Sequence, residues 1–465
     1  MRRIFISVIL LLFISNLQMF ILSLKEHILY AEATTIIEDE EKKFNISGFI
    51  DLQYQKRDYE SNDNIIASYT GVKGGGHFTQ NLLNLFFTFF ASENWLAFAE
   101  IRYLYTPTGE SESTLIDSDN DGIPDVIIST PFDNEGADSQ TEQFRYGSIH
   151  IERAYIEWNY LPYATFRFGR YFTPFGIWSQ DHGAHIITSI RVPYLVNFPY
   201  QSIGMPLRQT GIEFLGKMQF DNTNFMLDYA AYIGNGVSNT DAIFDNEDKN
   251  KAFGGFLNFT ILSIAEFIDI EFGCSGYMGE RSLLLYKTGT IEDIPSNDGT
   301  MTAYYVDYPS YGERFFAKQM EEAALAHCRI SIGSLPFNGL FIVQAEGMRQ
   351  WIDEFEDDRI IYTISGQPRG HEEFKLDVYY IQVEYQIYGK VTPYFRYQSL
   401  QSGSKDTQLL VFAKQMESYI IGINLKPEQR VTIKAEWYSV NMQSPFDRNI
   451  NNNMDTYQAS ITLAF

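Results

Sequence analysis

Residues 431–437 read VTIKAEW, and residues 457–465 read YQASITLAF. In both stretches apolar side chains occupy alternate positions, and the positions between them are mostly polar. Successive side chains of a β-strand point to opposite faces, so each stretch predicts a strand with one apolar and one polar face. The same alternation occurs at 95–105 (WLAFAEIRYLY) and 379–387 (YYIQVEYQI), whereas helical spacing is hard to find after residue 44.

The number and length of these segments favour membrane-spanning strands over those of a soluble β-sandwich. Globular strands average ~5–6 residues, and a strand that crosses a bilayer needs ~9–11 residues. Many of the predicted strands reach the longer range. About sixteen are predicted, near 44–56, 78–91, 95–105, 148–160, 164–172, 209–220, 224–234, 252–262, 266–278, 319–332, 339–352, 375–388, 391–400, 416–426, 430–441 and 456–465.

The connections between these strands alternate between short and long. The short ones are 92–94, 161–163, 221–223, 263–265, 333–338, 389–390 and 427–429. The long ones are 57–77, 106–147, 173–208, 235–251, 279–318, 353–374, 401–415 and 442–455. Bacterial outer-membrane barrels have short periplasmic turns and long extracellular loops. The sequence therefore predicts an all-β fold, a transmembrane antiparallel β-barrel of about sixteen strands, closed because lipid offers no partner for backbone polar groups.

Composition excludes several other classes of protein. The 465 residues carry 35 Lys and Arg against 59 Asp and Glu, a formal net charge of −24 that disfavours nucleic acid as a partner. A hydrophobic content of 45% is too high for disorder. Two cysteines are too few for a disulfide scaffold or a multi-cysteine zinc module. The aromatic content of 16% fits the rings that line both interfaces of a membrane barrel.

The N-terminus has the pattern of an export signal. Met1-Arg2-Arg3 precede an uncharged, mostly apolar stretch at 4–24, and Ala31-Glu32-Ala33 fits a cleavage site. We expect a signal peptide at 1–33, a short periplasmic lead-in at 34–43 and the barrel at 44–465; an uncleaved anchor helix is the alternative for the first segment. The terminal Phe465 resembles the C-terminal signal that directs barrel assembly in the bacterial outer membrane.

The lumen is expected to be wet, because a barrel of about sixteen strands encloses an aqueous channel. The polar faces of the strands place charges of both signs there. These are Arg102, Arg153, Arg167, Lys217, Arg329, Arg396 and Lys434, with Glu100, Glu157, Glu213, Asp228, Asp269, Glu271, Glu346, Glu384 and Glu436. They could brace the wall as ion pairs, or they could orient water and polar solutes by a transverse field.

A family resemblance is carried by RFGRYFTPFGIW (167–178), PLRQTGIEFLGK (206–217) and YIGNGVSNTDAIFDNEDKNKAFGGFLNF (232–259). In this order they resemble the phosphate-selective porin O and P family and its wider porin relatives. The resemblance implies an exported sixteen-stranded barrel, a homotrimer and a preference for small anions.

The third long loop, 173–208, contains the apolar run Pro193-Tyr194-Leu195-Val196 and, histidines aside, the charges of only Asp181, Arg191 and Arg208. We expect this loop to fold into the barrel and constrict the pore, as in trimeric porins. It could instead pack over the mouth or against a neighbouring subunit. The candidate pore-lining and constriction residues are Arg102, Arg153, Arg167, Lys217, Arg191, Arg208, Glu157, Glu213 and Arg396.

The predicted function is a porin for passive diffusion of small polar solutes or ions, in contact with outer-membrane lipid. The surplus of carboxylates predicts a weak cation bias, and the resemblance predicts an anion- or phosphate-selective pore instead. A surface receptor or adhesin whose loops carry the function is a further alternative. No enzyme is expected, because Ser179, Asp181, His182 and His185 show no readable catalytic spacing.

Transport needs no cofactor, but the extracellular loop at 106–147 contains DSDNDGIPD (117–125). Asp117, Asp119, Asp121 and Asp125 place oxygen ligands around Gly122, as at the start of a calcium loop. A Ca²⁺ site and a solvated acidic loop are the two interpretations. Cys274 and Cys328 fall on adjacent predicted strands with lipid-facing side chains, which leaves their pairing open.

Overall fold

The computed structural model describes residues 43–60, 76–108, 113–116, 126–129, 145–178, 186–195, 207–220, 223–236, 251–264, 267–286, 314–353, 374–402, 415–443 and 451–465. The predicted signal peptide lies outside these residues, and so does the predicted lead-in except for Lys43. The described strands are β1 (Phe44–Glu60), β2 (Gly76–Phe90), β3 (Trp95–Thr108), β4 (Ser113–Ile116), β5 (Val126–Ser129), β6 (Arg145–Leu161), β7 (Ala164–Phe172), β8 (Arg208–Gln219), β9 (Phe225–Gly234), β10 (Ala252–Ile264), β11 (Ile268–Tyr286), β12 (Arg314–Leu335), β13 (Gly339–Ile352), β14 (Phe374–Gln386), β15 (Val391–Ser402), β16 (Gln415–Glu428), β17 (Val431–Gln443) and β18 (Asn451–Ala464).

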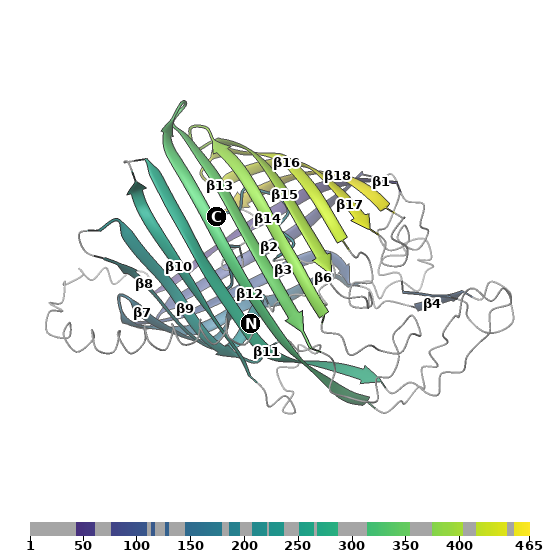
Figure 1. Cartoon of the computed structure of the whole chain (residues 1–465), viewed down its shortest axis with the longest axis horizontal. Helices are drawn as coiled ribbons and strands as arrows, with labels where there is room; N and C mark the ends of the chain where they lie inside the picture. Colours follow the sequence, from purple (N-terminus) through teal and green to yellow (C-terminus); the bar gives the residue numbers. More distant parts are fainter. Residues whose placement is uncertain are drawn as a thin grey trace.

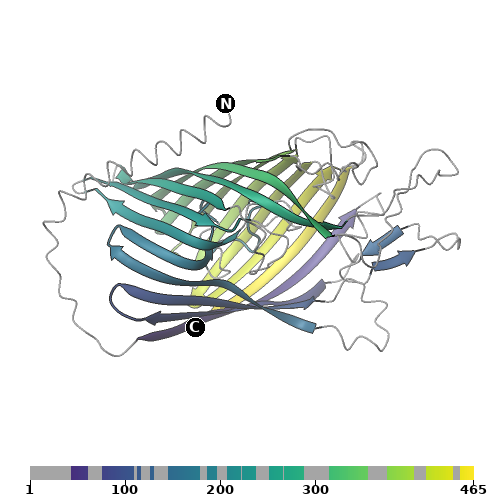
Figure 2. The same cartoon turned by 90° about the horizontal axis from the view of Figure 1, so that it is seen from below.

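Sixteen of these strands form one closed antiparallel barrel (Figures 1 and 2). Each pairs with the next along the chain, except that β3 pairs with β6 and leaves β4 and β5 as a separate two-stranded sheet. The ring closes where β1 pairs with β18, with Phe49 opposite Ala464 and Tyr54 opposite Ala459. Closure removes the free edges that an open sheet would expose.

The sixteen predicted barrel strands are confirmed, and two of them, 164–172 and 339–352, match in both bounds. The predicted loop 279–318 is wrong at both ends, because β11 continues to Tyr286 and β12 begins at Arg314. The hairpin of β4 and β5 was not predicted either. Alternation marks a strand only while one face meets an apolar medium, so it gives no signal where a strand continues beyond that zone.

The two faces of the barrel reverse the arrangement of a soluble protein. Exposed side chains include large apolar residues of many strands: Ile50, Leu52, Ile156, Phe168, Ile212, Phe253, Phe272, Ile381, Phe395, Ile421, Ile433, Ile461 and Leu463. Buried side chains include the polar residues at the alternate positions: Asp51, Asn84, Glu100, Glu213, Asn258, Glu346, Gln382, Arg396, Lys434 and Thr462. An apolar outer surface around a polar interior fits a barrel whose solvent is hydrocarbon.

Aromatic rings form a continuous row beside the short turns. Trp95 of β3 stacks on Trp158 of β6 with centroids 5.5 Å apart. The row continues from Trp158 to Phe166 of β7 at 5.6 Å and from Phe166 to Phe214 of β8 at 5.1 Å. Such rings are typical of the level where a barrel leaves the hydrocarbon and meets the headgroups.

Two further features concern the described residues only. They contain no helix that is long and apolar enough to cross a membrane. Both cysteines are free thiols, since the register places Cys274 opposite Ala326 and Cys328 opposite Phe272.

A charge on the outer face tests the assignment of the two faces. Ile421 of β16 is 52% exposed, and Ile421→Arg is expected to destabilise the barrel by about 2–4 kcal/mol, the cost of an arginine near a bilayer midplane. The measurement is denaturant unfolding in phospholipid vesicles, with Ile421→Leu as the matched control. Equal stability of the two variants would contradict a lipid-facing position for residue 421.

Candidate functional site: the barrel lumen

The third long loop contributes two described segments, 173–178 and 186–195, and both lie against the inner wall of the barrel. Trp178, Ile187 and Tyr194 of these segments are buried. Asp181, His182 and His185 lie outside the described residues. The loop leaves the barrel at the end of β7 and returns at the start of β8, so its contacts with β11 to β18 take it across the lumen.

The first segment is bonded through its backbone. Gly176 N donates to Ser275 Oγ of β11 at 3.0 Å, and Ile177 N donates to Glu346 Oε1 of β13. Gly176 has a φ of +74°, and a Cβ there would lie 2.8 Å from Glu346 Oε1. Only glycine therefore allows the Pro174-Phe175-Gly176 turn to approach this carboxylate so closely.

The second segment is bonded to a carboxylate and an ammonium group of β17. Glu436 Oε2 accepts from Ile190 N at 2.9 Å and from Arg191 N at 3.4 Å. Lys434 Nζ donates to the carbonyl oxygen of Ser189 at 3.1 Å. Backbone donors and acceptors inside the barrel thus find charged partners, which a buried polar group requires.

Arg396 of β15 lies completely buried beneath the loop. Its Nη1 donates to the carbonyl oxygen of Arg191 at 2.8 Å, and its Nη2 donates to Ser189 Oγ. Its guanidinium also lies 4.9 Å from the ring centroid of Trp178. Arg396 therefore lies on the inner face of the wall, where the loop covers it, and it positions the loop.

Tyr194 anchors the end of the second segment. Its hydroxyl lies 2.6 Å from the hydroxyl of Tyr438, and its N–H donates to Gln398 Oε1 at 3.3 Å. Burial raises the pKa of the Tyr194 phenol above its ordinary value, which favours the protonated hydroxyl in this contact.

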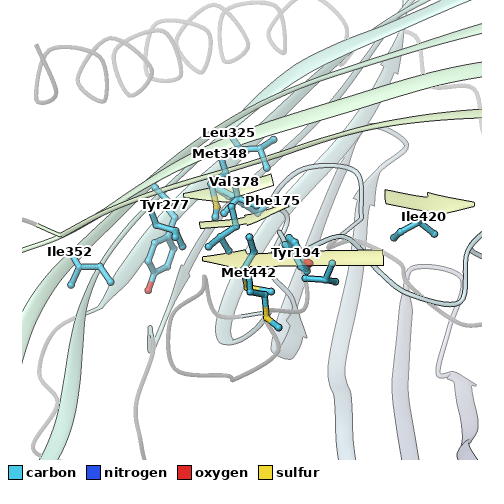
Figure 3. Packing of buried hydrophobic residues seen from close by; sticks show 14 of the residues in the cluster. Phe175, Tyr194, Tyr277, Leu325, Met348, Ile352, Val378, Ile420 and Met442 are labelled. Atoms are coloured by element: carbon cyan, nitrogen blue, oxygen red, sulfur yellow. The ribbon is translucent and has the colours of Figure 1, made fainter. Parts of the chain in front are cut away.

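Around these contacts the inner wall is apolar. Figure 3 shows Phe175 and Tyr194 of the loop among the side chains of Leu325, Met348 and Val378. The wall side of this cluster comes from strands β7 and β9 to β17: Tyr171, Tyr232, Ala252, Tyr277, Ala323, Leu325, Met348, Ile352, Leu376, Val378, Tyr394, Leu400, Met416, Ile420, Tyr438, Val440 and Met442. One part of the lumen is therefore a packed hydrophobic core.

The opposite wall carries a network of ion pairs on β2, β3, β6 and β8. Arg153 Nε lies 2.6 Å from Glu100 Oε2, and Arg102 Nη1 lies 3.3 Å from Glu152 Oε1. Arg208, at the end of the loop, also pairs with Glu152. Asn84 donates to Glu100 Oε1 at 2.7 Å and joins the strands of the network.

A second group lies beside it on β6, β7 and β8. Arg167 Nε lies 2.7 Å from Glu157 Oε2, and its Nη1 lies 3.1 Å from Glu213 Oε2. Lys217 stands apart, where its Nζ lies 3.3 Å from Asp228 Oδ1. The predicted pore-lining residues thus fall into four places: Arg102 with Arg153 and Arg208, Arg167 with Glu157 and Glu213, Lys217 alone, and Arg191 with Arg396.

Alternation along the sequence does not predict Glu152 as a lumen residue, because in a regular strand its side chain would lie on the face opposite to that of Arg153. The register shifts between Glu100 and Ile101, so that Arg153 pairs with Glu100 and Ile151 pairs with Ile101. Glu152 is the extra residue of this β-bulge, which lets two consecutive residues contribute to one network. Two adjacent charges, Glu152-Arg153, in an otherwise alternating strand were the available signal.

The predicted calcium ligands Asp117, Asp119, Asp121 and Asp125 lie outside the described residues. Within the part of the chain that the structure describes, no three His, Cys, Asp or Glu side chains are grouped to hold a metal ion.

No family model and no curated protein matches the chain. Solved structures with a similar fold include OmpT of Vibrio cholerae (7% identity, 93% of this chain, 100% of that chain, TM-score 0.44). A second is the outer membrane channel DcaP of Acinetobacter baumannii (10% identity, 91% of this chain, 97% of that chain, TM-score 0.44). A third is OprB of Pseudomonas putida (8% identity, 92% of this chain, 95% of that chain, TM-score 0.45). The barrel of the present chain is established by its own strand pairing.

Loss of the carboxylate at 436 is expected to free the second loop segment. In Glu436→Leu the amides of Ile190 and Arg191 lose their acceptor, so their hydrogen exchange should accelerate about tenfold or more. Glu436→Gln keeps an acceptor oxygen and should retain most of the protection. Hydrogen–deuterium exchange by mass spectrometry measures this. The control is Glu417→Leu, which removes a carboxylate of β16 bonded to Tyr397 and Gln415; equal exchange in the two leucine variants would refute the anchoring role.

Proposed function

We propose that the protein is a channel of the bacterial outer membrane for passive diffusion of small polar solutes or ions. The observation that carries this proposal is the closed barrel of sixteen strands with apolar side chains outside and charged side chains inside. A cylinder of this size has room for water, and only a lipid environment makes its outer surface favourable. The N-terminal export pattern supports the location.

The third long loop acts in this proposal as the constriction. Its two described segments are bonded to buried groups of the far wall, namely Glu346, Arg396 and Glu436. Solutes then pass between the loop and the wall of β2, β3, β6, β7 and β8. Because the loop is fixed by charged partners, the constriction is permanent.

For small inorganic ions we propose a weak cation bias, since the chain carries a surplus of carboxylates that a low-dielectric wall focuses into the pore. Selectivity for anions such as phosphate is the alternative that the family resemblance suggests. A homotrimer is the proposed assembly, on the same resemblance.

Planar bilayers test the channel and its selectivity. Adding purified protein to a bilayer in KCl is expected to increase the membrane conductance in discrete steps. In a KCl gradient, the reversal potential is expected to have the sign of a pore that is more permeable to potassium than to chloride. A potential of the opposite sign would support the anion alternative. A barrel that inserts and conducts nothing would favour a surface receptor or adhesin whose loops carry the function.

Calcium binding at 117–125 is a separate proposal. The flanking strands β4 and β5 pair with each other, Ile116 opposite Val126, so the acidic segment connects two ends that lie close together. Isothermal titration with Ca²⁺ is expected to give saturable heat that disappears in the double variant Asp119→Ala, Asp121→Ala. Identical heats in both proteins would contradict the calcium site and support the interpretation of a solvated acidic loop.

A further inference from the structure

We propose that the network of Arg102, Arg153 and Arg208 with Glu100 and Glu152 is a binding site for an organic monoanion, a carboxylate or sulfonate that carries an apolar body. This inference rests on the channel proposed above and names a class of solute for it. We refer to these five residues as the arginine cluster.

The arginine cluster lies on the wall across the barrel from β13 and β14. The barrel is a ring of sixteen strands, so β3 lies eight places from β13, and β6 lies eight places from β14. The described loop segments bond to β11, β13 and β15–β18. A solute that passes the loop is therefore directed towards β3 and β6.

The charges of the arginine cluster do not balance. Arg153 pairs with Glu100 and Arg208 pairs with Glu152, whereas Arg102 pairs with both carboxylates, its Nη1 3.3 Å from Glu152 Oε1 and its Nη2 3.6 Å from Glu100 Oε1. Among the described residues, three guanidinium groups thus stand with two carboxylates, which leaves one positive charge. A single negative charge on a solute neutralises it, whereas a dianion would bring a second, uncompensated charge beside Glu152 and Glu100.

Water reaches the cations of the arginine cluster more than its anions. The side chains of Arg102, Arg153 and Arg208 are 14%, 19% and 25% exposed. Glu100 and Glu152 lie behind them at 2% and 4%. A passing solute therefore meets guanidinium N–H donors, whose forked geometry suits a carboxylate or a sulfonate.

Apolar groups adjoin these donors. The guanidinium of Arg153 lies 4.5 Å from the ring centroid of Phe172 and 5.0 Å from that of Phe98. Phe98 in turn stacks on Phe86 and Tyr155, with centroids 6.3 and 5.1 Å away. A solute with an apolar body can thus keep that body against rings while its anionic head meets the arginines.

The loop also carries apolar side chains. Ile186 is 49% exposed, and Ile177, Val192 and Leu195 are partly exposed while they pack against the buried Trp178, Ile187 and Tyr380. A strongly hydrated ion gains nothing from such a surface, whereas the hydrocarbon part of an organic anion does. The two sides together favour an amphiphilic monoanion over phosphate.

The test combines conductance and binding on the folded, full-length protein. Benzoate is expected to reduce the open-channel potassium current in planar bilayers at millimolar concentration. Benzyl alcohol, the neutral analogue of benzoate, should leave this current unchanged, and phosphate should reduce it less than benzoate does. Titration calorimetry of benzoate into detergent-solubilised protein measures the same site without any conductance. Equal effects of benzyl alcohol, or a stronger effect of phosphate, would overturn the proposed class of ligand.

Two variants locate the site. Arg208→Gln removes the excess charge and should weaken benzoate binding about tenfold, the size expected for one charged hydrogen-bond partner. Lys217→Gln removes a more exposed cation of a balanced pair with Asp228 and should leave binding unchanged. Equal loss in both variants would assign the effect to overall charge and refute the site. Channels that conduct but whose current and calorimetry show no effect of benzoate would refute the proposed anion site alone. The absence of any conductance would refute the proposed channel function.

Discussion

The structure depends on one constraint, that each backbone N–H and C=O group of a chain in hydrocarbon needs a partner within the chain. A flat sheet would leave two strands half unpaired, so β1 must pair with β18, and the first strand of the barrel meets the last. Closure then fixes the roles of the two faces. Alternate side chains meet lipid and must be apolar, and the others enclose a space in which charges are stable only with water or with one another.

The interior satisfies this second requirement in two different ways. On one wall, carboxylates and guanidinium groups pair across neighbouring strands, and the guanidinium groups remain partly exposed. On the other, Glu346, Arg396 and Glu436 bond to the backbone of the third loop and are almost completely buried. The loop therefore supplies partners to charges that would otherwise face an apolar cluster, and those charges in turn fix the loop.

Much of this arrangement could be predicted from the sequence. Alternation with period two identified all sixteen barrel strands, since every second side chain along each of them faces lipid and must be apolar. It also placed Glu346, Arg396 and Glu436 on the inner face. It could not show which loop atoms they bond, because that depends on the path of the backbone across the lumen. Glu152 was missed because a bulge changes the phase of β6 at that residue, and strand ends were missed where β11 and β12 continue past the alternating region.

The bonds between Ile190 and Glu436 join residues 246 positions apart, and the seam between β1 and β18 joins still more distant ones. Contacts of such large sequence separation form slowly, because a long stretch of chain must be ordered before they are gained. During biogenesis the second loop segment consequently lacks its Glu436 partner until β17 is in place, whereas Ser275 and Glu346, the partners of the first segment, belong to the earlier strands β11 and β13. The loop is therefore fixed in steps, and its attachment is complete only when the last strands of the wall have formed.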